Sequence, residues 1–229
     1  MQAQTRCIGV VVLLALVVAG CGRRDAAAVK LGSEAMEKGD FDLAISQFTE
    51  AIRLDPKNAE MYYLRGVAYK RKGKFDKAVT DFTEAIRLNP TFYEAYCHRG
   101  SVHAYFNDPN EAIADYTAAI RVRPTSSDAY CLRGEAYAHK GEYDKAIADC
   151  NEAVRLNPTS SQPYCSRGEV YGYKREYDKA IADYTEAIRL DPKDAEAYNA
   201  RGIAHGLKGE KTQADADLAQ ARKLGYKGK

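Results

Sequence analysis

The chain has 229 residues, of which 45% are hydrophobic and 29% charged, and its formal net charge is only +2. The length exceeds what one small domain needs and suits an array of repeats. The charges are close to balance and include no run of five or more like charges. Such a chain lacks the concentrated basic face that nucleic-acid binding requires, so we expect no nucleic-acid partner.

Residues 1–20 have the layout of a secretory signal peptide. Arg6 is followed by an apolar run from Cys7 to Gly20, which is shorter than the roughly 20 residues that span a bilayer. A short charged start and an apolar stretch that ends in small residues are typical of a segment that is removed after export. We therefore do not expect residues 1–20 to be part of the fold.

The end of this run, Val18-Ala19-Gly20-Cys21, resembles the bacterial lipobox, in which a cysteine follows small residues. The resemblance implies that Cys21 is fatty-acylated and becomes the new N-terminus, with residues 21–24 as a short tether. An ordinary signal cleaved near Gly20 and an uncleaved anchor are the alternatives. Mature bacterial lipoproteins carry two or three acyl chains, which anchor a protein stably. Gly22 stands where an aspartate favours inner-membrane retention in enteric bacteria, which implies the outer membrane, facing the periplasm.

A fixed period of 34 residues dominates the rest of the chain. It is marked by five prolines that close nearly identical phrases such as AIRLDP, namely Pro56, Pro90, Pro124, Pro158 and Pro192. This period is typical of stacked helix-turn-helix units. We expect an array over residues 25–229 with units at 25–58, 59–92, 93–126, 127–160, 161–194 and 195–228.

Each unit is predicted to contain two helices. In the second unit the first helix is expected from about residue 60 to 71, and Gly73 should end it as a left-handed cap. Asp76 is expected to cap the second helix, which should end near Leu88, before Pro90. In the third unit the glycine turn is replaced by residues 107–110, and Asn110 is expected to cap the next helix.

These repeats resemble the tetratricopeptide repeat (TPR) family, whose pattern has an aromatic, a small residue and a tyrosine on the first helix, and alanine, aromatic, alanine and proline around the second. The pattern recurs in register, with glycine at 32, 66, 100, 134, 168 and 202 and alanine at 44, 78, 112, 146, 180 and 214. The resemblance implies an all-α, right-handed superhelical solenoid of six helix-turn-helix repeats.

An arginine replaces the usual leucine of the family in five repeats, and each of those repeats also has an aspartate on its second helix. The arginines are Arg65, Arg99, Arg133, Arg167 and Arg201, and the aspartates are Asp81, Asp115, Asp149, Asp183 and Asp217. The first repeat has Leu31 and Gln47 instead. This co-occurrence predicts an Arg–Asp pair within each repeat, and we expect an exposed pair of modest strength. A charged binding ladder is the alternative interpretation.

No pattern of catalytic or cofactor-binding residues is present, since the chain lacks a phosphate-binding glycine loop, HExxH and GxSxG. We therefore expect neither an enzyme, a cofactor nor a metal site. His103 and His205 replace a first-helix tyrosine and are predicted to be packed in the core. Cys150 replaces a core aromatic, and free thiols are expected at Cys97, Cys131, Cys150 and Cys165 because neighbouring helices lie too far apart for disulfides along this ladder.

In TPR proteins the first helix of each repeat lines the concave groove, so the resemblance implies a candidate partner-binding surface. It comprises Tyr63, Lys70 and Arg71 in the second repeat, Cys97, Ser101 and Tyr105 in the third, Cys131, Glu135 and His139 in the fourth, Cys165, Glu169 and Tyr173 in the fifth, and Asn199 in the sixth. These positions vary between repeats, which is typical of a ligand surface and equally of an unconstrained one.

The resulting hypothesis is a membrane-anchored TPR lipoprotein of the bacterial cell envelope. It would act as an adaptor or assembly scaffold that holds a protein or peptide partner in its groove. The alternative hypothesis is a binder of a small envelope ligand such as a peptidoglycan fragment, which would need a closed aromatic pocket rather than scattered tyrosines.

Overall fold

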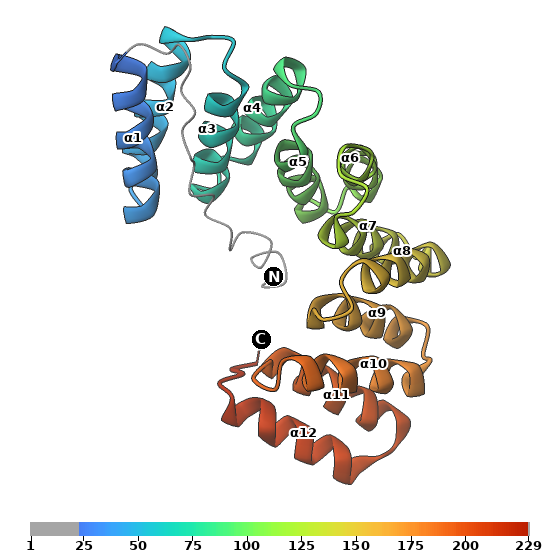
Figure 1. Cartoon of the computed structure of the whole chain (residues 1–229). Helices are drawn as coiled ribbons and strands as arrows, with labels where there is room; N and C mark the ends of the chain where they lie inside the picture. The colour runs from blue at the N-terminus through green and yellow to red at the C-terminus, as the bar shows by residue number, and fades with distance from the viewer. Residues whose placement is uncertain (1–22, 229) are drawn as a thin grey trace. The chain divides into compact units, whose positions relative to one another are not determined.

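The computed structural model describes residues 23–228, with side chains from residue 27 onward, and the predicted signal segment and Cys21 lie outside the described residues. The described chain is all α-helical, as predicted, with twelve helices and no strand (Figure 1). It forms two compact units, one up to Val122 and one from Arg123. The first contains α1 (Arg23–Lys38), α2 (Phe41–Leu54), α3 (Ala59–Arg71), α4 (Phe75–Leu88), α5 (Tyr93–Tyr105) and α6 (Pro109–Val122).

The second unit contains α7 (Ser127–His139), α8 (Tyr143–Leu156), α9 (Ser161–Tyr173), α10 (Tyr177–Leu190), α11 (Ala195–Lys208) and α12 (Lys211–Lys223). Within each unit the two helices of a repeat pack together, and the second helix of one repeat packs on the first helix of the next. First helices also contact one another: α3 contacts α5, and α9 contacts both α7 and α11. Each unit is therefore a helical repeat solenoid, as the period in the sequence predicts.

The core of each repeat is a small-large-small row on its second helix. In α2, Ala44, Phe48 and Ala51 are at most 1% exposed. The same row recurs in the next repeat as Ala78, Phe82 and Ala85, all of them fully buried. Small residues bring the helices together and the large one fills the space between them. In α8 the central position is Cys150, which is fully buried, so the prediction of a small core residue there is confirmed.

A glycine on the first helix faces the aromatic ring of the second. A Cβ atom on Gly66 would lie 2.7 Å from Phe82 Cε1, and one on Gly168 would lie 2.9 Å from Tyr184 Cε1. Neither distance leaves room for a methyl group, so the glycine sets how closely the two helices approach. Opposite Gly134 the smaller Cys150 leaves 3.2 Å to its Sγ.

The turn between the two helices of a repeat needs one residue in a left-handed conformation. Gly73, at φ +74°, ends the first helix of its repeat as predicted. Asn107 (φ 58°) and Arg175 (φ 60°) take the same place in the third and fifth repeats. Asparagine tolerates this conformation, whereas for arginine it costs roughly 1–2 kcal/mol. The hydrogen-bonded turn between α9 and α10, in which Arg175 N–H donates to the Gly172 carbonyl at 2.9 Å, therefore holds Arg175 in a conformation that its residue type does not favour.

Two predicted helix caps are wrong. Asp76 lies inside the first turn of α4, and Lys74 occupies the cap position without a side-chain hydrogen bond. Asn110 likewise lies inside α6, which begins at Pro109. Proline favours the first helical position because its φ is preset and it has no N–H to satisfy there. Asp76 instead contributes through the helix dipole, since a negative charge near a helix N-terminus is favourable.

The predicted Arg–Asp pair is present within each of the last five repeats. Arg65 donates from Nε and Nη2 to the two carboxylate oxygens of Asp81, both at 2.8 Å. The equivalent pairs are Arg99–Asp115, Arg133–Asp149, Arg167–Asp183 and Arg201–Asp217, at 2.6–2.7 Å. The expectation of an exposed pair is wrong, because the Asp81 and Arg65 side chains are only 6% and 17% exposed.

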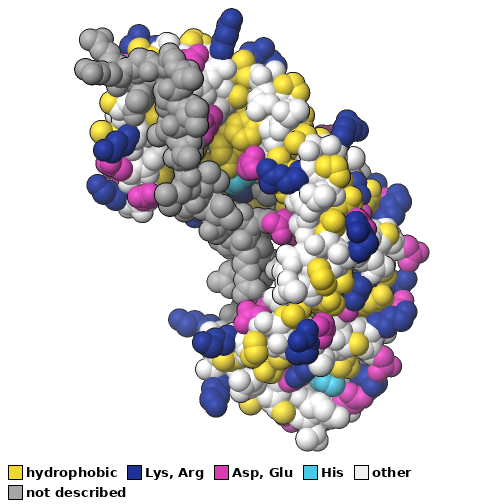
Figure 2. All heavy atoms as spheres, viewed as in Figure 1, with side chains coloured by type: hydrophobic (Ala, Val, Ile, Leu, Met, Phe, Trp, Pro, Cys, Tyr) yellow, Lys and Arg dark blue, Asp and Glu magenta, His cyan; other side chains and the backbone are white. Residues whose placement is uncertain are grey.

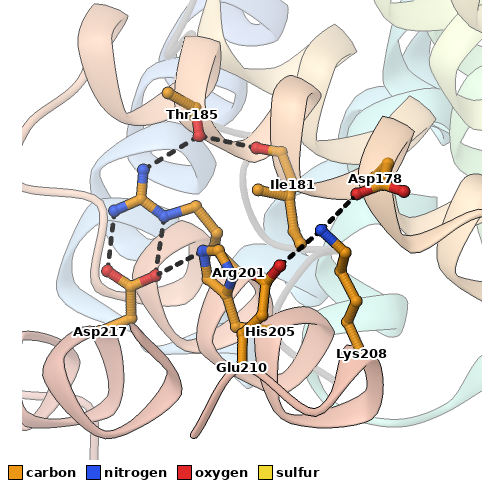
Figure 3. Close-up of polar contacts among 8 residues, drawn as sticks. All are labelled: Asp178, Ile181, Thr185, Arg201, His205, Lys208, Glu210 and Asp217. Atoms are coloured by element: carbon orange, nitrogen blue, oxygen red, sulfur yellow. Dashed lines mark hydrogen bonds and ion pairs between the residues drawn. The ribbon is translucent and has the colours of Figure 1, made fainter. Parts of the chain in front are cut away.

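Arginines of these pairs also form hydrogen bonds to the preceding repeat. Arg65 Nη1 donates to Thr49 at 3.1 Å and Arg99 Nη1 to Thr83 at 2.9 Å. Figure 3 shows the sixth repeat, where Arg201 bridges Asp217 and Thr185. The same view shows Lys208, which pairs with Asp178 of the preceding repeat at 2.6 Å. The arginine therefore joins the two helices of its own repeat and one helix of the repeat before it.

The two glycines of α9 give matched tests of close packing. Gly168→Ala places a methyl group 2.9 Å from Tyr184, whereas at Gly172 nothing lies within 4 Å of the new Cβ. We expect Gly168→Ala to destabilise the fold by about 1–3 kcal/mol, and Gly172→Ala to stabilise it by about 0.5–1 kcal/mol through helix propensity. Urea unfolding of both variants measures the difference, and equal effects would show that the helix spacing does not depend on Gly168.

The Arg–Asp pair can be tested with the residues that the first repeat already uses. Asp183→Gln leaves the Arg167 guanidinium without its carboxylate, and we expect a loss of about 3–5 kcal/mol. The double variant Arg167→Leu/Asp183→Gln reproduces the Leu31 and Gln47 of the first repeat. It should cost clearly less than the sum of the two single changes. A double-mutant cycle from urea unfolding measures this coupling, and additive costs would contradict a coupled buried pair.

Candidate functional site

The predicted surface residues of the first helices, apart from Lys70, occupy three positions, each recurring from one repeat to the next. The position nearest the helix N-terminus holds Tyr63, Cys97, Cys131, Cys165 and Asn199, all of them buried or half-buried. The middle position, one turn on, includes Ser101, Glu135 and Glu169. The last, at the C-terminal end, holds Arg71, Tyr105, His139 and Tyr173, all of which are exposed. Exposure therefore increases toward the C-terminal end of each first helix.

Tyr63 packs into the fold instead of presenting a surface. Its ring lies 4.9 Å from that of Phe92, 5.4 Å from His98 and 6.1 Å from Phe82. Burial raises the pKa of the Tyr63 phenol. Cys131 is only 3% exposed, so it does not line a surface either. The prediction that Tyr63 and Cys131 line an open surface is wrong, because the following repeat covers this position.

A basic side chain crosses between two repeats of the first unit. Lys70 of α3 donates to the Ser101 hydroxyl of α5, which donates in turn to the His98 carbonyl at 2.7 Å. Burial, and secondarily the cations Lys70 and Arg71, lower the pKa of His98 to about 3. Its buried Nδ1 has no hydrogen-bond partner among the described residues. His98 is therefore neutral and serves packing.

An aromatic cluster is exposed at the end of α5. The Tyr105 ring stacks on Phe75 at 4.9 Å, and Phe106 meets both rings edge-on at 5.2 Å. Tyr105 and Phe106 are 44% and 58% exposed. The equivalent pair two repeats later is Tyr143–Tyr173, whose ring centres are 6.2 Å apart. Such stacking holds an exposed ring in a preferred orientation.

In the second unit, α7 and α9 form an open hollow with acidic walls. Its lining includes Glu135 and His139 from α7, and Ser166, Glu169 and Tyr173 from α9. Ser166 donates to Glu135 at 3.1 Å, and the Tyr173 hydroxyl donates to Glu169 at 2.8 Å. Four predicted surface residues, Glu135, His139, Glu169 and Tyr173, thus line the same hollow. Asn199 lies half-buried on the neighbouring helix, α11.

Glu135 is an unfavourable place for a negative charge. Burial, and secondarily the negative charge of Glu169, raise the pKa of Glu135 to about 7, although the Ser166 hydroxyl opposes that shift. The carboxyl is therefore partly protonated near neutral pH, and a neighbouring cation would favour its ionised form.

Two exposed residues of α11 were missed by the sequence analysis. Ile203 and Leu207 are 50% and 61% exposed. They are the equivalents of Glu169 and Tyr173 in the following repeat, so they hold the middle and last surface positions of the sixth repeat. The repeat period of 34 residues, counted on from Glu169 and Tyr173, would have identified Ile203 and Leu207. Their apolar character marks this part of the surface as different from α7.

The described residues offer no centre for metal chemistry, since no three His, Cys, Asp or Glu side chains between residues 23 and 228 gather to hold a metal ion. The four described cysteines are free thiols, as expected. Burial raises the pKa of Cys150 to about 12 and raises that of Cys131 as well, so both thiols are protonated and unreactive. His205, predicted to pack in the core, is half-buried with Nδ1 2.6 Å from Glu210 (Figure 3).

The charged side chains are mixed rather than segregated. On the face shown in Figure 2, Lys and Arg alternate with Asp and Glu over the described residues. On the second helices of the repeats, called the outer helices below, much of this mixing is pairing, as in Arg155–Glu152 at 2.6 Å and Arg189–Glu186 at 2.7 Å. Among the helices described for residues 23–228, none has both the length and the apolar character needed to cross a bilayer.

Helix pairs that recur with a fixed period define a helical repeat protein with exposed, variable first-helix positions. The tetratricopeptide repeat model matches residues 29–91 and 97–161, which is more than half of the chain, and a second TPR model matches residues 173–209. The chain belongs to the tetratricopeptide repeat family. This fold is that of a protein–protein interaction scaffold, and TPR proteins are generally not enzymes.

Several solved structures share the fold. MamA is 28% identical over 69% of this chain and 93% of its own, with a TM-score of 0.61. PilW, a widely conserved type IV pilus biogenesis factor, is 19% identical over 89% of this chain and 94% of its own, with a TM-score of 0.78. YrrB, a TPR protein with an unusual peptide-binding site, is 20% identical over 79% of this chain and 93% of its own, with a TM-score of 0.60. Among curated proteins, none matches this chain in sequence.

The raised pKa of Glu135 gives the stability of the fold a defined pH dependence. Below about pH 4.5 the Glu135 carboxyl is protonated in both the folded and the unfolded chain, so it does not lower the free energy of unfolding. As pH rises from 4.5 to about 7, the unfolded chain releases this proton while the folded chain retains it, so the folded state loses stability. Glu135→Gln should therefore raise the melting temperature by roughly 2–6 °C at pH 8 and leave it unchanged at pH 4.5.

Glu152→Gln is the matched control, because the Glu152 side chain is partly exposed and its hydrogen bond with Arg155 lowers its pKa. It should give no gain at pH 8. Thermal melts of both variants at the two pH values make the comparison. An equal gain from Glu135→Gln at pH 4.5 and pH 8 would show that ionisation of Glu135 is not the cause.

Proposed function

We propose that this chain is a membrane-anchored TPR lipoprotein that acts as a protein–protein interaction adaptor or assembly scaffold at the bacterial cell envelope. One observation carries the proposal. The first helices expose aromatic and apolar side chains, such as Tyr105, Tyr173 and Leu207, whereas charged side chains of the outer helices pair with one another. Exposed aromatic residues set among polar ones are typical of surfaces that bind proteins.

The proposed anchor rests on Cys21 and on the distance from it to the fold. The helix α1 begins at Arg23, two residues after Cys21. A lipid on Cys21 would therefore hold the repeats next to the membrane without a long tether. A partner bound there would be concentrated near the membrane surface. The absence of an aspartate at residue 22 supports the outer membrane, facing the periplasm, as the proposed location.

A protein partner fits the surface better than a small ligand does. Small-ligand sites enclose most of the ligand, whereas the hollow between α7 and α9 is partly open to solvent. A peptide or partner helix can extend from this hollow over neighbouring exposed residues. The resemblance in fold to PilW, a pilus biogenesis factor, and to YrrB, which has a peptide-binding site, supports an assembly role.

Photo-crosslinking in the native cell tests the proposal. A photo-reactive residue at Tyr173 should capture one dominant protein, whereas the same residue at Lys145 should not. Lys145 lies on the outer helix α8 and pairs with Glu142 at 2.7 Å. Cys21→Ser should move the chain from the membrane fraction to the soluble fraction and weaken capture at Tyr173. Equal capture at Tyr173 and Lys145 would contradict the adaptor role, and unchanged fractionation would contradict the lipid anchor.

A further inference from the structure

The first helices of the second unit leave an apolar surface uncovered. Tyr173 of α9 is 50% exposed, and Ile203 and Leu207 of α11 are 50% and 61% exposed. Tyr173 and Leu207 hold the same position in successive repeats, Ile203 lies one turn from Leu207, and α9 packs against α11. These three side chains therefore share one face. Exposed apolar residues that gather on one face indicate an interaction site.

This apolar surface continues into the unneutralised carboxylates of Glu135 and Glu169. Glu169 lies one helical turn before Tyr173 and accepts its hydroxyl at 2.8 Å, while Glu135 accepts the hydroxyl of Ser166 at 3.1 Å. Within residues 23–228 neither carboxylate forms an ion pair. The outer-helix glutamates Glu152 and Glu186, by contrast, pair with an arginine three residues further on. The middle surface position thus runs from Glu135 through Glu169 to Ile203.

We propose that this surface binds a short peptide segment with lysine or arginine side chains at one end and large apolar side chains at the other. The basic side chains contact Glu135 and Glu169, and the apolar ones pack on Tyr173, Ile203 and Leu207. This inference rests on the proposed adaptor function and specifies the chemistry of its partner.

The spacing of the helices limits the length of that segment. Packed helices lie about 8–10 Å apart, so the path across α7, α9 and α11 covers about 20 Å. An extended chain rises about 3.3 Å per residue, which gives a segment of about six to eight residues. The basic and apolar side chains should then be separated by about four residues.

Charge complementarity selects a basic partner over an acidic one. An acidic segment would bring like charges to Glu135 and Glu169 in a partly water-excluded hollow, which is unfavourable. A basic segment supplies the counter-charge that the described chain does not provide. The apolar end adds affinity by covering Ile203 and Leu207, while the carboxylates fix the register of the segment.

Fluorescence anisotropy with a defined peptide tests the inference. The probe is a labelled octapeptide with two lysines at one end, leucine and phenylalanine at the other, and four serine or glycine residues between them, prepared in both orders. The protein is the full chain in mild detergent. We expect one order to bind, and binding to weaken at least tenfold in Glu135→Gln/Glu169→Gln and in Ile203→Ser/Leu207→Ser.

The control variant Glu152→Gln/Glu186→Gln removes the same charge from the outer helices, and binding should stay within twofold of the unaltered protein. Equal affinity for the two glutamate double variants overturns the inference. So does equal binding of a peptide with glutamates in place of the lysines, and so does a lack of binding in both orders. Circular dichroism melts confirm that each variant is folded.

The adaptor function is decided separately, by crosslinking at Tyr173. If a captured partner contacts Tyr173 through a segment without lysine or arginine, the chemistry inferred here is overturned and the adaptor function stands. If nothing is captured at Tyr173 while the octapeptide binds as expected, the peptide chemistry stands and the adaptor function is contradicted.

Discussion

The close contact between a first-helix glycine and the side chain that faces it on the second helix, an aromatic ring in four of the six repeats, is the constraint on which the other features of each repeat depend. At Gly66 there is no space for a Cβ atom beside Phe82, so the two helices approach to a distance that only glycine permits. Alanines on either side of the ring maintain the approach along the helix. Glycine and alanine return in every repeat and the aromatic ring in four of the six, so successive repeats present similar shapes to one another. The 34-residue period of the sequence thus produces regularly stacked helix pairs within each unit.

The sequence predicted this packing because its cause lies within one repeat. Glycine, alanine and proline recur in register, and the co-occurrence of arginine and aspartate indicated their pairing. The sequence did not predict that this Arg–Asp pair is buried, because its burial depends on the neighbouring repeat. Thr49 of the preceding repeat accepts a hydrogen bond from Arg65 at 3.1 Å. The left-handed backbone of Arg175 was not predicted either, because arginine is not a residue type that favours this conformation.

The candidate surface was predicted less well because a helical face alone does not determine exposure. Tyr63 and Tyr173 were placed on the same face, yet Tyr63 packs against Phe92 and His98 while Tyr173 is half exposed. The difference follows from position along the helix, since the next repeat covers the N-terminal end and leaves the C-terminal end open. The repeat offset, applied to Glu169 and Tyr173, leads to Ile203 and Leu207, whose exposure the structure establishes.

Glutamates are paired with arginines on the second helices, but among the described residues they have no such partner at the proposed binding surface. Glutamates of the second helices such as Glu152 and Glu186 pair with an arginine of the same helix, so a partner gains little by approaching them. Glu135 has a raised pKa because burial and Glu169 disfavour its charge. Without a partner, the chain therefore carries a carboxyl that reduces its own stability near neutral pH. A cationic side chain would favour the ionised form of Glu135 and offset that cost, and what stabilises only the bound state contributes to affinity. A carboxyl that the fold leaves unneutralised thus supports binding at this surface.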